Sequence, residues 1–519
     1  MSHLPSIDSA TVRFHLLARN EIALIDLREE ADFAQGHPLF ASQLSAGLVE
    51  TTVLDRIPRR DALIVLYDNG EGLVEAAADR LQAMGYTDVR ALEGGLEGWK
   101  AAGYELFEDV NSYSKAFGEL VEVSRHTPSL SAQEVQDLIR TKADLAILDV
   151  RRFEEYATMS IPTGTSVPGA ELALRARAVA PSAETTIVVN CAGRTRSIIG
   201  TQSLVNVGIP NPVFALRNGT IGWTLAGQAL DTGQARRGAA VGEPQANEAR
   251  VRARAVSYRA GVRHIGLAEL DLLAADTSRT LYRFDVRLPA DYAAGHIAGF
   301  RNAQGGQLVQ ETDMFAPLRG ARIVLADDLG SRADMTASWL AQMGWEVLVL
   351  DGWPQDRLET GEWAPSLPPR PSVSFIETGD LMAAAARPGT VLFDLAPSPR
   401  YNAGHIPGAR FAIRSRLPEM LGDDETEILL ISPDGILAEF AAADIAKSRP
   451  VSVLRGGTAA WIEAGNALET AAEPVSGDVY KRPYEGTDNA SEAMQAYLDW
   501  EAGLVDQLER DGTHGFFVI

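Results

Sequence analysis

The chain has 519 residues, of which 46% are hydrophobic and 23% charged, a composition that excludes wholesale disorder and fibrous repeats. At about 150 residues per domain, this length predicts three or four domains in series rather than one core. The net charge of −23 argues against nucleic acid or an anionic membrane surface as the main partner.

Four segments of the chain resemble one another. Each begins with a hydrophobic run that ends in an aspartate, at position 26, 149, 285 or 394, and a second hydrophobic run follows. The residue just past the second run lies 42 positions after the aspartate in the first three segments and 38 in the fourth; these residues are Asp68, Cys191, Asp327 and Ser432. A turn with glycine and tryptophan closes each segment. The repeated landmarks predict a tandem array of four related domains.

Strands alternate with helical patterns within each unit, most clearly in the second. Ser131 stands three residues before Glu134, the pattern of a capping box at a helix start. The strands AILDV and TIVVN follow, and then the helical stretch SIIGTQSLVNVG and the strand PVFAL. Continuous Val/Ile/Leu strands between helices are typical of a parallel sheet covered on both faces. We therefore predict an α/β fold with four small, doubly wound domains.

The landmarks also set the expected boundaries. We place domain 1 at residues 1–110, domain 2 at 125–235, domain 3 at 260–362, domain 4 at 372–472, and a C-terminal helical tail at 475–519. Residues 108–128 and 234–262 are expected to be irregular linkers, and the proline-rich stretch 361–373 a stiff connector. The tail is predicted to form one amphipathic helix over residues 491–512, packed on the last domains.

The single cysteine, Cys191, follows a buried strand and precedes a helix. One cysteine excludes intramolecular disulfides and a cysteine-rich zinc site. In a parallel sheet, ligands bind where the carboxyl ends of strands meet helix amino termini. The loop after Cys191 is predicted to aim backbone amides and the helix dipole at the sulfur, and Arg194 and Arg196 add positive charge. These features favour the thiolate over the thiol. They also favour a reactive cysteine over the alternative, an inert cysteine buried in the core.

On these residues the chain resembles tandem rhodanese-domain proteins of the thiosulfate sulfurtransferase family. The matching features are Asp149-Val150-Arg151, Gly404-His405-Ile406, the loop from Cys191 to Arg196, and the closing glycines and tryptophan at 456, 457 and 461. The resemblance covers about residues 5–470. It implies that Cys191 takes sulfane sulfur from thiosulfate or a related donor as a persulfide, releases sulfite, and passes the sulfur to cyanide or a thiol.

The resemblance also implies roles for the site residues, and it implies no cofactor or metal. Cys191 is expected to be the nucleophile, and Arg196 to orient the oxyanion of the donor. The expected substrate-binding residues are Ala192, Gly193, Arg194, Thr195 and Ser197 of the loop, together with Asp149 and Arg151.

Two other functions stay open. The first is a binding module that senses persulfide or oxidant at Cys191 without turnover. The second is a cysteine phosphatase or arsenate reductase, in which five residues separate the cysteine from the arginine. Only four residues separate Cys191 from Arg196, and the shorter loop suits a sulfur atom better than a tetrahedral phosphate.

Domains 1, 3 and 4 are predicted to be catalytically silent, because neither aspartate nor an unassisted serine can carry a persulfide. They either complete the active-site cleft or serve as scaffolding. Asp68 and Asp327 have no neighbouring sequence motif that would supply further metal ligands, so we do not expect them to bind a metal. In domain 2, Met159 and Ser160 replace the Gly-His pair, and we expect Ser160 to be structural. Trp353 replaces a glycine in domain 3, so its last turn must differ.

The remaining expectations concern packing, location and partners. Histidines 37, 296 and 405 and tryptophans 99, 223 and 461 are predicted to be structural. The chain has no apolar stretch of about 18 residues and no secretory signal, so we expect a cytoplasmic protein. Its partners would be a small sulfur donor and a thiol acceptor, with no nucleic acid or membrane, and a homodimer stays open.

Overall fold

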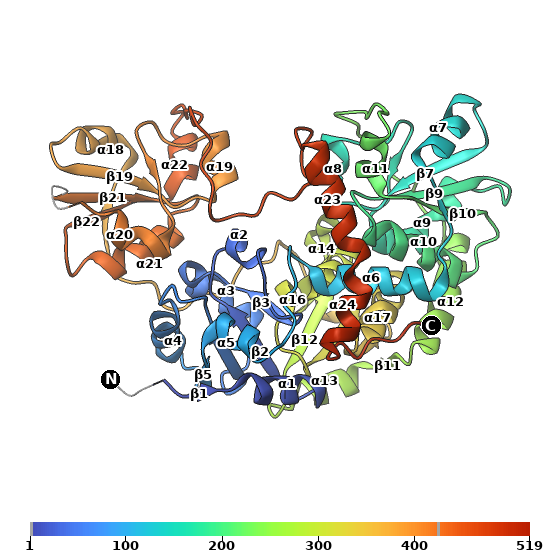
Figure 1. Cartoon of the computed structure of the whole chain (residues 1–519), viewed down its shortest axis with the longest axis horizontal. Coiled ribbons are helices and arrows are strands. Elements are labelled where there is room, and N and C mark those ends of the chain that lie inside the picture. The colour runs from blue at the N-terminus through green and yellow to red at the C-terminus, as the bar shows by residue number, and fades with distance from the viewer. Residues whose placement is uncertain (1–3, 423–425) are drawn as a thin grey trace. The chain divides into compact units, whose positions relative to one another are not determined.

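The computed structural model describes residues 4–422 and 426–519. The first three residues of domain 1 and residues 423–425 of domain 4 lie outside the described residues. Each predicted domain contains one five-stranded sheet of parallel strands flanked by helices (Figure 1). The predicted α/β fold with four doubly wound domains is therefore confirmed.

Domain 1 builds its sheet in the order β1-β5-β4-β2-β3. The central strands β2 and β4 are buried along their whole length, as expected for strands with helices on both faces. The elements are β1 (Ser6–Ile7), α1 (Ser9–Leu17), β2 (Ile22–Asp26), α2 (Glu30–Phe33), β3 (Ala41–Gln43), α3 (Val49–Arg56), β4 (Leu63–Tyr67), α4 (Val74–Ala83), β5 (Val89–Leu92) and α5 (Gly95–Ala101).

Domain 2 repeats this order as β6-β10-β9-β7-β8. The capping box at Ser131 and Glu134 is confirmed, with both reciprocal hydrogen bonds present. The elements are β6 (Ser129–Leu130), α7 (Ala132–Arg140), β7 (Leu145–Asp149), α8 (Phe153–Thr158), β8 (Thr165–Ser166), α9 (Leu172–Val179), β9 (Thr186–Asn190), α10 (Thr195–Val207), β10 (Val213–Leu216) and α11 (Gly219–Leu225).

Domain 3 has the sheet order β11-β16-β15-β12-β14 and an added antiparallel pair, β13 with β17. The elements are β11 (Arg263–Ile265), α13 (Leu267–Ala275), β12 (Leu281–Asp285), α14 (Pro289–Ala294), β13 (His296–Ile297), β14 (Arg301–Asn302), α15 (Gly305–Gln310), α16 (Thr312–Phe315), β15 (Arg322–Ala326), α17 (Ser331–Gln342), β16 (Glu346–Leu350) and β17 (Leu358–Glu359).

Domain 4 has the order β18-β22-β21-β19-β20. Its elements are β18 (Ser374–Ile376), α18 (Thr378–Ala385), β19 (Thr390–Asp394), α19 (Ser398–Ala403), β20 (Arg410–Phe411), α20 (Leu417–Met420), β21 (Glu427–Ile431), α21 (Ile436–Ile445), β22 (Val451–Leu454) and α22 (Gly457–Glu463). Residues 361–373, the predicted connector, contain no helix or strand.

The chain divides into two compact units. One contains residues 1–9, 23–110 and 364–481, and therefore most of domains 1 and 4; the other contains residues 10–22, 111–363 and 482–519, and therefore domains 2 and 3 with the end of the chain. Within the first unit, Arg414 of domain 4 forms a buried ion pair with Glu50 of domain 1. Within the second, Arg332 of domain 3 forms a buried ion pair with Glu171 of domain 2.

Two predicted linkers are helical, which corrects the prediction that they are irregular. Residues Ser112–Arg125 form α6 and residues Glu243–Arg259 form α12. Helix α6 packs on α10 of domain 2, and α12 packs on α9, α10 and α17. Helix α12 buries one face against the domains, whereas the first half of α6 is buried on all sides. This packing stabilises both helices, although many of their residues are polar.

The tail also differs from the prediction. It forms two helices, α23 (Ser491–Ala502) and α24 (Leu504–Asp511), with Gly503 between them. Both helices lie against α6 (Figure 1), and side chains of α23 join a buried cluster with Ala192 and Ile221 of domain 2. Residues 517 and 519 at the end of the tail donate backbone hydrogen bonds to Gln342 of domain 3. The tail therefore packs on domains 2 and 3, and its two helices lie on the domain 2 side, which the sequence did not predict.

The predicted structural roles of the histidines and tryptophans are confirmed. His296 and His405 stack on the tyrosine four residues earlier, and each of the three tryptophan indoles donates to a carbonyl six residues later. Ser160 exchanges two backbone hydrogen bonds with Asp231, and His405 makes the same bridge with Glu469. Ser160 thus replaces the histidine in a structural turn, as expected.

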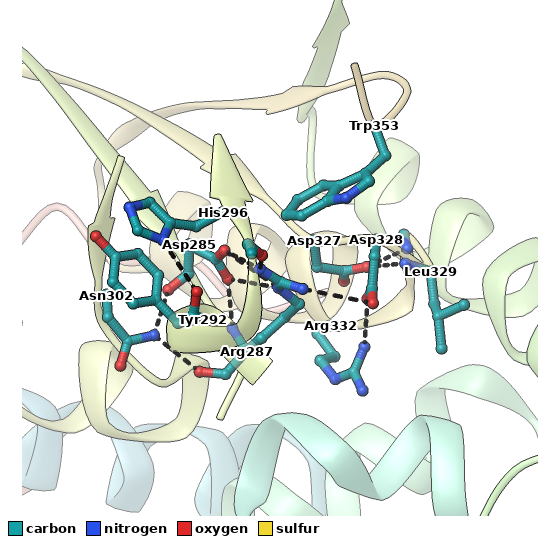
Figure 2. A network of polar contacts seen from close by, with 12 residues as sticks. Asp285, Arg287, Tyr292, His296, Asn302, Asp327, Asp328, Leu329, Arg332 and Trp353 are labelled. Carbon is teal, nitrogen blue, oxygen red and sulfur yellow. Dashed lines mark hydrogen bonds and ion pairs between the residues drawn. The ribbon is translucent and has the colours of Figure 1, made fainter. Parts of the chain in front are cut away.

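The last turn of domain 3 differs from the other three, as the tryptophan at position 353 predicted. Domains 1, 2 and 4 have a helix at this point, whereas domain 3 has a short 3-10 turn over Gln355–Arg357. The Trp353 ring lies 4.2 Å from the guanidinium carbon of Arg287, over the polar network that Figure 2 shows.

Candidate active site

Cys191 lies at the carboxyl end of β9, directly before the loop that leads into α10. It is buried, with 1% of its surface exposed. The 13-residue helix α10 begins at Thr195, so its amino terminus and positive dipole end face this loop. The predicted position of the cysteine, at a strand end and before a helix, is therefore confirmed.

The turn at Gly219, which closes the domain, packs against the backbone of the cysteine loop. Gly219 has φ +54°, and a β-carbon there would clash with the carbonyl oxygens of Cys191, Ala192 and Gly193. Backbone N–H groups of the turn donate to two of these carbonyls, from Thr220 to Cys191 and from Ile221 to Ala192, both at 3.0 Å. The repeated glycine of the closing turn is therefore required by close backbone approach.

Arg196 is held against domain 2 by a bidentate ion pair. Its two terminal nitrogens lie 2.8 and 2.9 Å from the carboxylate oxygens of Glu155, on α8. Burial acts to raise the pKa of Glu155, but the Arg196 charge and hydrogen bonds outweigh it and hold that pKa at about 2. Arg196 is also close enough to Cys191 for its charge to lower the pKa of the thiol.

Arg194 faces helix α6. Its Nε lies 2.8 Å from Glu119, its Nη2 pairs with both Glu119 and Glu122, and its Nη1 donates to Asn218 at 3.0 Å. The charge of Arg194 is therefore met locally by two carboxyl groups. Its predicted contribution of positive potential at Cys191 stays a prediction.

The pKa of the Cys191 thiol is raised, contrary to the expectation from the sequence that the loop favours the thiolate. Burial raises the pKa of the thiol, and the charge of Glu501 raises it further, whereas Arg196 and the side chain and backbone of Ser197 lower it. Burial has the largest effect. The loop therefore contains the features that favour a thiolate, but in this enclosed site they do not outweigh desolvation.

Asp149 and Arg151, which the sequence places among the substrate-binding residues, form a buried ion pair with each other. Arg151 is 1% exposed and donates to both Asp149 oxygens and to the Met159 carbonyl. The same pair recurs as Asp26 with Arg28 and as Asp285 with Arg287. Because it also occurs in domains without the cysteine, we interpret it as a support for the loop rather than as a contact to substrate.

The residues in the cysteine position of the other domains accept hydrogen bonds from their own loops. Asp327 Oδ1 accepts from the backbone N–H groups of Leu329 and Gly330, and its Oδ2 accepts from Ala333 at 2.7 Å (Figure 2). Asp68 accepts from Gly70 and Leu73, and the Ser432 hydroxyl accepts from Ala438. Each loop therefore places backbone donors around the polar atoms of the side chain at this position.

The end of the chain covers the cysteine loop, which the sequence did not predict. Tyr484 and Tyr497 pack against Ala192, and a β-carbon at Gly193 would lie 3.1 Å from Tyr497 Cε1 and 3.4 Å from Glu501 Oε2. About 300 residues separate this segment from the loop, so no local pattern could reveal the contact. The clustering of Tyr497 and Glu501 on one helical face was the only available signal.

A buried lysine of α6 lies beside this cover. Lys115 is 2% exposed, and its Nζ lies 4.9 to 5.4 Å from the ring centres of Tyr484, Tyr497 and Trp500. Cation–π contacts of this kind stabilise a desolvated ammonium. They hold the segment from Tyr484 to Trp500 over domain 2.

Across residues 4–422 and 426–519, no three His, Cys, Asp or Glu side chains gather in a group that could hold a metal ion. No helix in the same ranges has the length and apolar character needed to cross a membrane.

The rhodanese-like domain family matches the chain four times, at residues 15–102, 131–226, 268–353 and 377–464, which together make up more than half of it. The chain belongs to the rhodanese-like family. The crystal structure of a thiosulfate sulfurtransferase from Pseudomonas aeruginosa is similar over 99% of this chain and 100% of its own, with 54% identity and a TM-score of 0.97. A rhodanese-related protein from Thermoplasma volcanium has 19% identity over 19% of this chain and 99% of its own, with a TM-score of 0.18. No curated protein matches the chain.

Proposed function

We propose that this protein is a thiosulfate sulfurtransferase that works through a persulfide on Cys191. The observation that carries the proposal is the full-length similarity to the Pseudomonas aeruginosa enzyme at 54% identity. The sequence has one thiol, and it stands at the strand end where the loop and α10 meet. Cys191 reacts as its thiolate, after its proton has passed to solvent: it attacks the outer sulfur of thiosulfate, the bond between the two sulfurs of the donor breaks, and sulfite leaves with that electron pair, which gives the anionic persulfide.

Arg196 is the residue that we propose to orient the oxyanion of the donor. Its planar guanidinium matches a sulfonate better than an ammonium does, and Glu155 fixes its orientation from the far side. The backbone N–H groups from Ala192 to Ser197 are proposed to hold the persulfide. The hydrogen bonds that the equivalent loop of domain 3 donates to Asp327 support this role.

Domain 3 borders a cavity beside the cysteine loop, and Cys191 is not among the residues that line it. This cavity of about 50 Å³ is lined by Thr195 and Arg196 of the loop and, from domain 3, by Gly305, Val309 and Trp339 among others. The cavity supports the first of the two sequence-based interpretations, in which a silent domain completes the cleft. We propose that it accommodates the part of a substrate that extends away from the sulfur.

The test is intact-mass spectrometry of the protein after incubation with thiosulfate, 3-mercaptopyruvate or glutathione persulfide, followed by addition of cyanide or a thiol. A sulfur atom gained from thiosulfate and lost to the acceptor over many turnovers would support the proposal. Gain of one sulfur that no acceptor removes would favour the sensing module instead. Hydrolysis of a phosphate ester or reduction of arsenate, without sulfur uptake, would favour the phosphatase-related alternative.

Location and partners follow from the same chemistry. A catalytic thiol must stay reduced between turnovers, so we propose a reducing compartment, most simply the cytoplasm. The partners are a small-molecule sulfur donor and a thiol acceptor, and the absence of nucleic acid and membrane partners stays a prediction from the charge. The homodimer that the sequence left open also stays a prediction, which sedimentation analysis would test.

A further inference from the structure

Glu501 is a buried carboxyl group that contacts the cysteine loop from outside domain 2. None of its surface is exposed. Its Oε1 accepts hydrogen bonds from the Tyr497 hydroxyl at 2.8 Å and from the Thr195 hydroxyl at 3.4 Å. Its Oε2 has no hydrogen-bond partner among the described residues, and this is the oxygen nearest Gly193. A buried carboxyl oxygen without a partner is costly unless a ligand meets it.

The groups that face Glu501 come from every element packed around it. Helix α6 contributes Lys115 and Glu119, the loop contributes Arg194 and Cys191, and α23 contributes Tyr497. Burial and the Glu119 carboxyl raise the pKa of Glu501 to about 8, although Lys115, Tyr497 and Arg194 act to lower it. Glu501 is therefore protonated at neutral pH, and it can donate a proton at the cysteine loop.

We propose that Glu501 is a further catalytic residue: it protonates the outer sulfur of the anionic Cys191 persulfide while a thiolate acceptor attacks that sulfur. This inference rests on the proposed sulfurtransferase function. In the step, the acceptor sulfur bonds to the outer sulfur, and the bond from the outer sulfur to Cys191 Sγ breaks with its electron pair on Sγ. The proton of Glu501 moves to the outer sulfur. The products are a neutral persulfide of the acceptor, the Cys191 thiolate and the Glu501 carboxylate.

The need for this proton depends on the acceptor. When a thiolate takes the sulfur, the negative charge of the product persulfide stays on the transferred sulfur, and protonation neutralises it as the bond forms. When sulfite takes the sulfur, the product is thiosulfate, whose oxygens share the charge. Loading from thiosulfate is the reverse of that second reaction, so it also needs no proton. Glu501 should therefore matter for thiol acceptors only.

The experiment compares two single-turnover reactions of the persulfide-loaded full-length chain. Loaded wild-type, Glu501→Gln and Asp499→Asn proteins are mixed either with an aromatic thiol that is ionised at every pH used or with sulfite. Glutamine keeps the size and neutrality of the protonated acid but cannot give up a proton. Asp499 is the matched control, because it lies on the same helix with its side chain exposed and hydrogen-bonded to Gln495.

We expect Glu501→Gln to slow transfer to the thiol by about 100-fold or more at neutral pH, as for loss of a general acid. The wild-type rate should fall as the pH rises through about 8, and this fall should be absent from Glu501→Gln. Transfer to sulfite and loading from thiosulfate should stay within about two-fold of wild type, and Asp499→Asn should match wild type throughout.

Two results would overturn the inference: an unchanged thiol rate in Glu501→Gln, or an equal loss of rate with thiol and with sulfite. If Glu501→Gln does not fold, Glu501→Ala replaces it, and a thiol rate equal to wild type would again contradict the assignment. Absence of persulfide in the wild-type protein would instead contradict the proposed function, so the two failures are distinguishable.

Discussion

Domains 2 and 3 carry the same loop at the same strand end, and they use it differently. In both, an arginine lies five positions after the first residue that follows the strand: Arg196 after Cys191, and Arg332 after Asp327. In domain 3 the loop amides are occupied by the carboxylate of Asp327. In domain 2 the residue is Cys191, and we propose that a second sulfur on it reaches the equivalent backbone donors. Domain 3 therefore contains its own hydrogen-bond acceptor, whereas we propose that domain 2 acquires one from a substrate.

The arginines differ as well. Arg196 pairs with Glu155 inside its own domain, but Arg332 pairs with Asp328 of its own loop and with Glu171 of domain 2. The silent loop thus became part of the contact between domains 2 and 3. The domain 3 loop therefore presents backbone donors at this position without a nucleophile, and a side chain of the same loop accepts their hydrogen bonds.

The largest effect should come from Cys191→Ser, which removes the only thiol of the chain. We expect sulfur transfer to fall to background, because a hydroxyl cannot carry sulfane sulfur, with little change in stability at a loop. Steady-state assays with thiosulfate and cyanide measure the sulfur transfer, and a thermal melt measures the stability. Activity near that of wild type would show that another group carries the sulfur. It would contradict the proposed difference between the catalytic loop of domain 2 and the silent loop of domain 3.

The next effect should come from Arg196→Lys, which keeps the charge but loses the two-pronged fork. We expect kcat/KM for thiosulfate to fall by about 10- to 100-fold, mainly through KM if Arg196 holds ground state and transition state alike. Arg332→Lys is the matched control in domain 3 and should leave KM unchanged. Equal kinetics for Arg196→Lys, Arg196→Ala and wild type would show that the loop amides bind the donor alone.

A smaller effect is expected from Asp327→Asn in domain 3. Asparagine has one acceptor oxygen, so it cannot accept all the hydrogen bonds that the two Asp327 oxygens receive. We expect the free energy of local opening to fall by about 1–3 kcal/mol, measured by amide hydrogen exchange over residues 328–336. Asp271→Asn, at an exposed ion pair with Arg357, is the control. Unchanged exchange would mean that the loop does not depend on its anion.

The smallest effect concerns Arg194 and the titration of Cys191. Because burial raises the pKa of the thiol, alkylation by iodoacetamide should be slow at neutral pH and should speed up as the pH rises beyond the ordinary thiol range. Arg194→Glu should move the midpoint further upward, since it adds a negative charge. Because Glu119 and Glu122 already meet the charge of Arg194, we expect a smaller shift than for Arg196→Gln. A shift as large as that of Arg196→Gln would restore Arg194 as a main source of positive potential.

Much of the catalytic domain was predictable because its signals are local. The strand before Cys191, the glycine-rich turn at Gly219 and the structural role of Ser160 all follow from short patterns that recur in the chain. The thiolate was predicted less well. The sequence shows the charges near the sulfur, but it does not show how deeply the sulfur is buried, and burial has the largest effect on its pKa.

The sequence by itself determined the four-domain α/β architecture, the catalytic domain and the nucleophile, because strand and helix periodicities and a unique thiol are properties of the chain alone. The tertiary structure decided what surrounds the nucleophile. Packing brought α6 and the end of the chain onto domain 2, and with them Lys115 and Glu501. These contacts join residues far apart in the sequence through nonlocal burial of apolar surface, which no local pattern specifies.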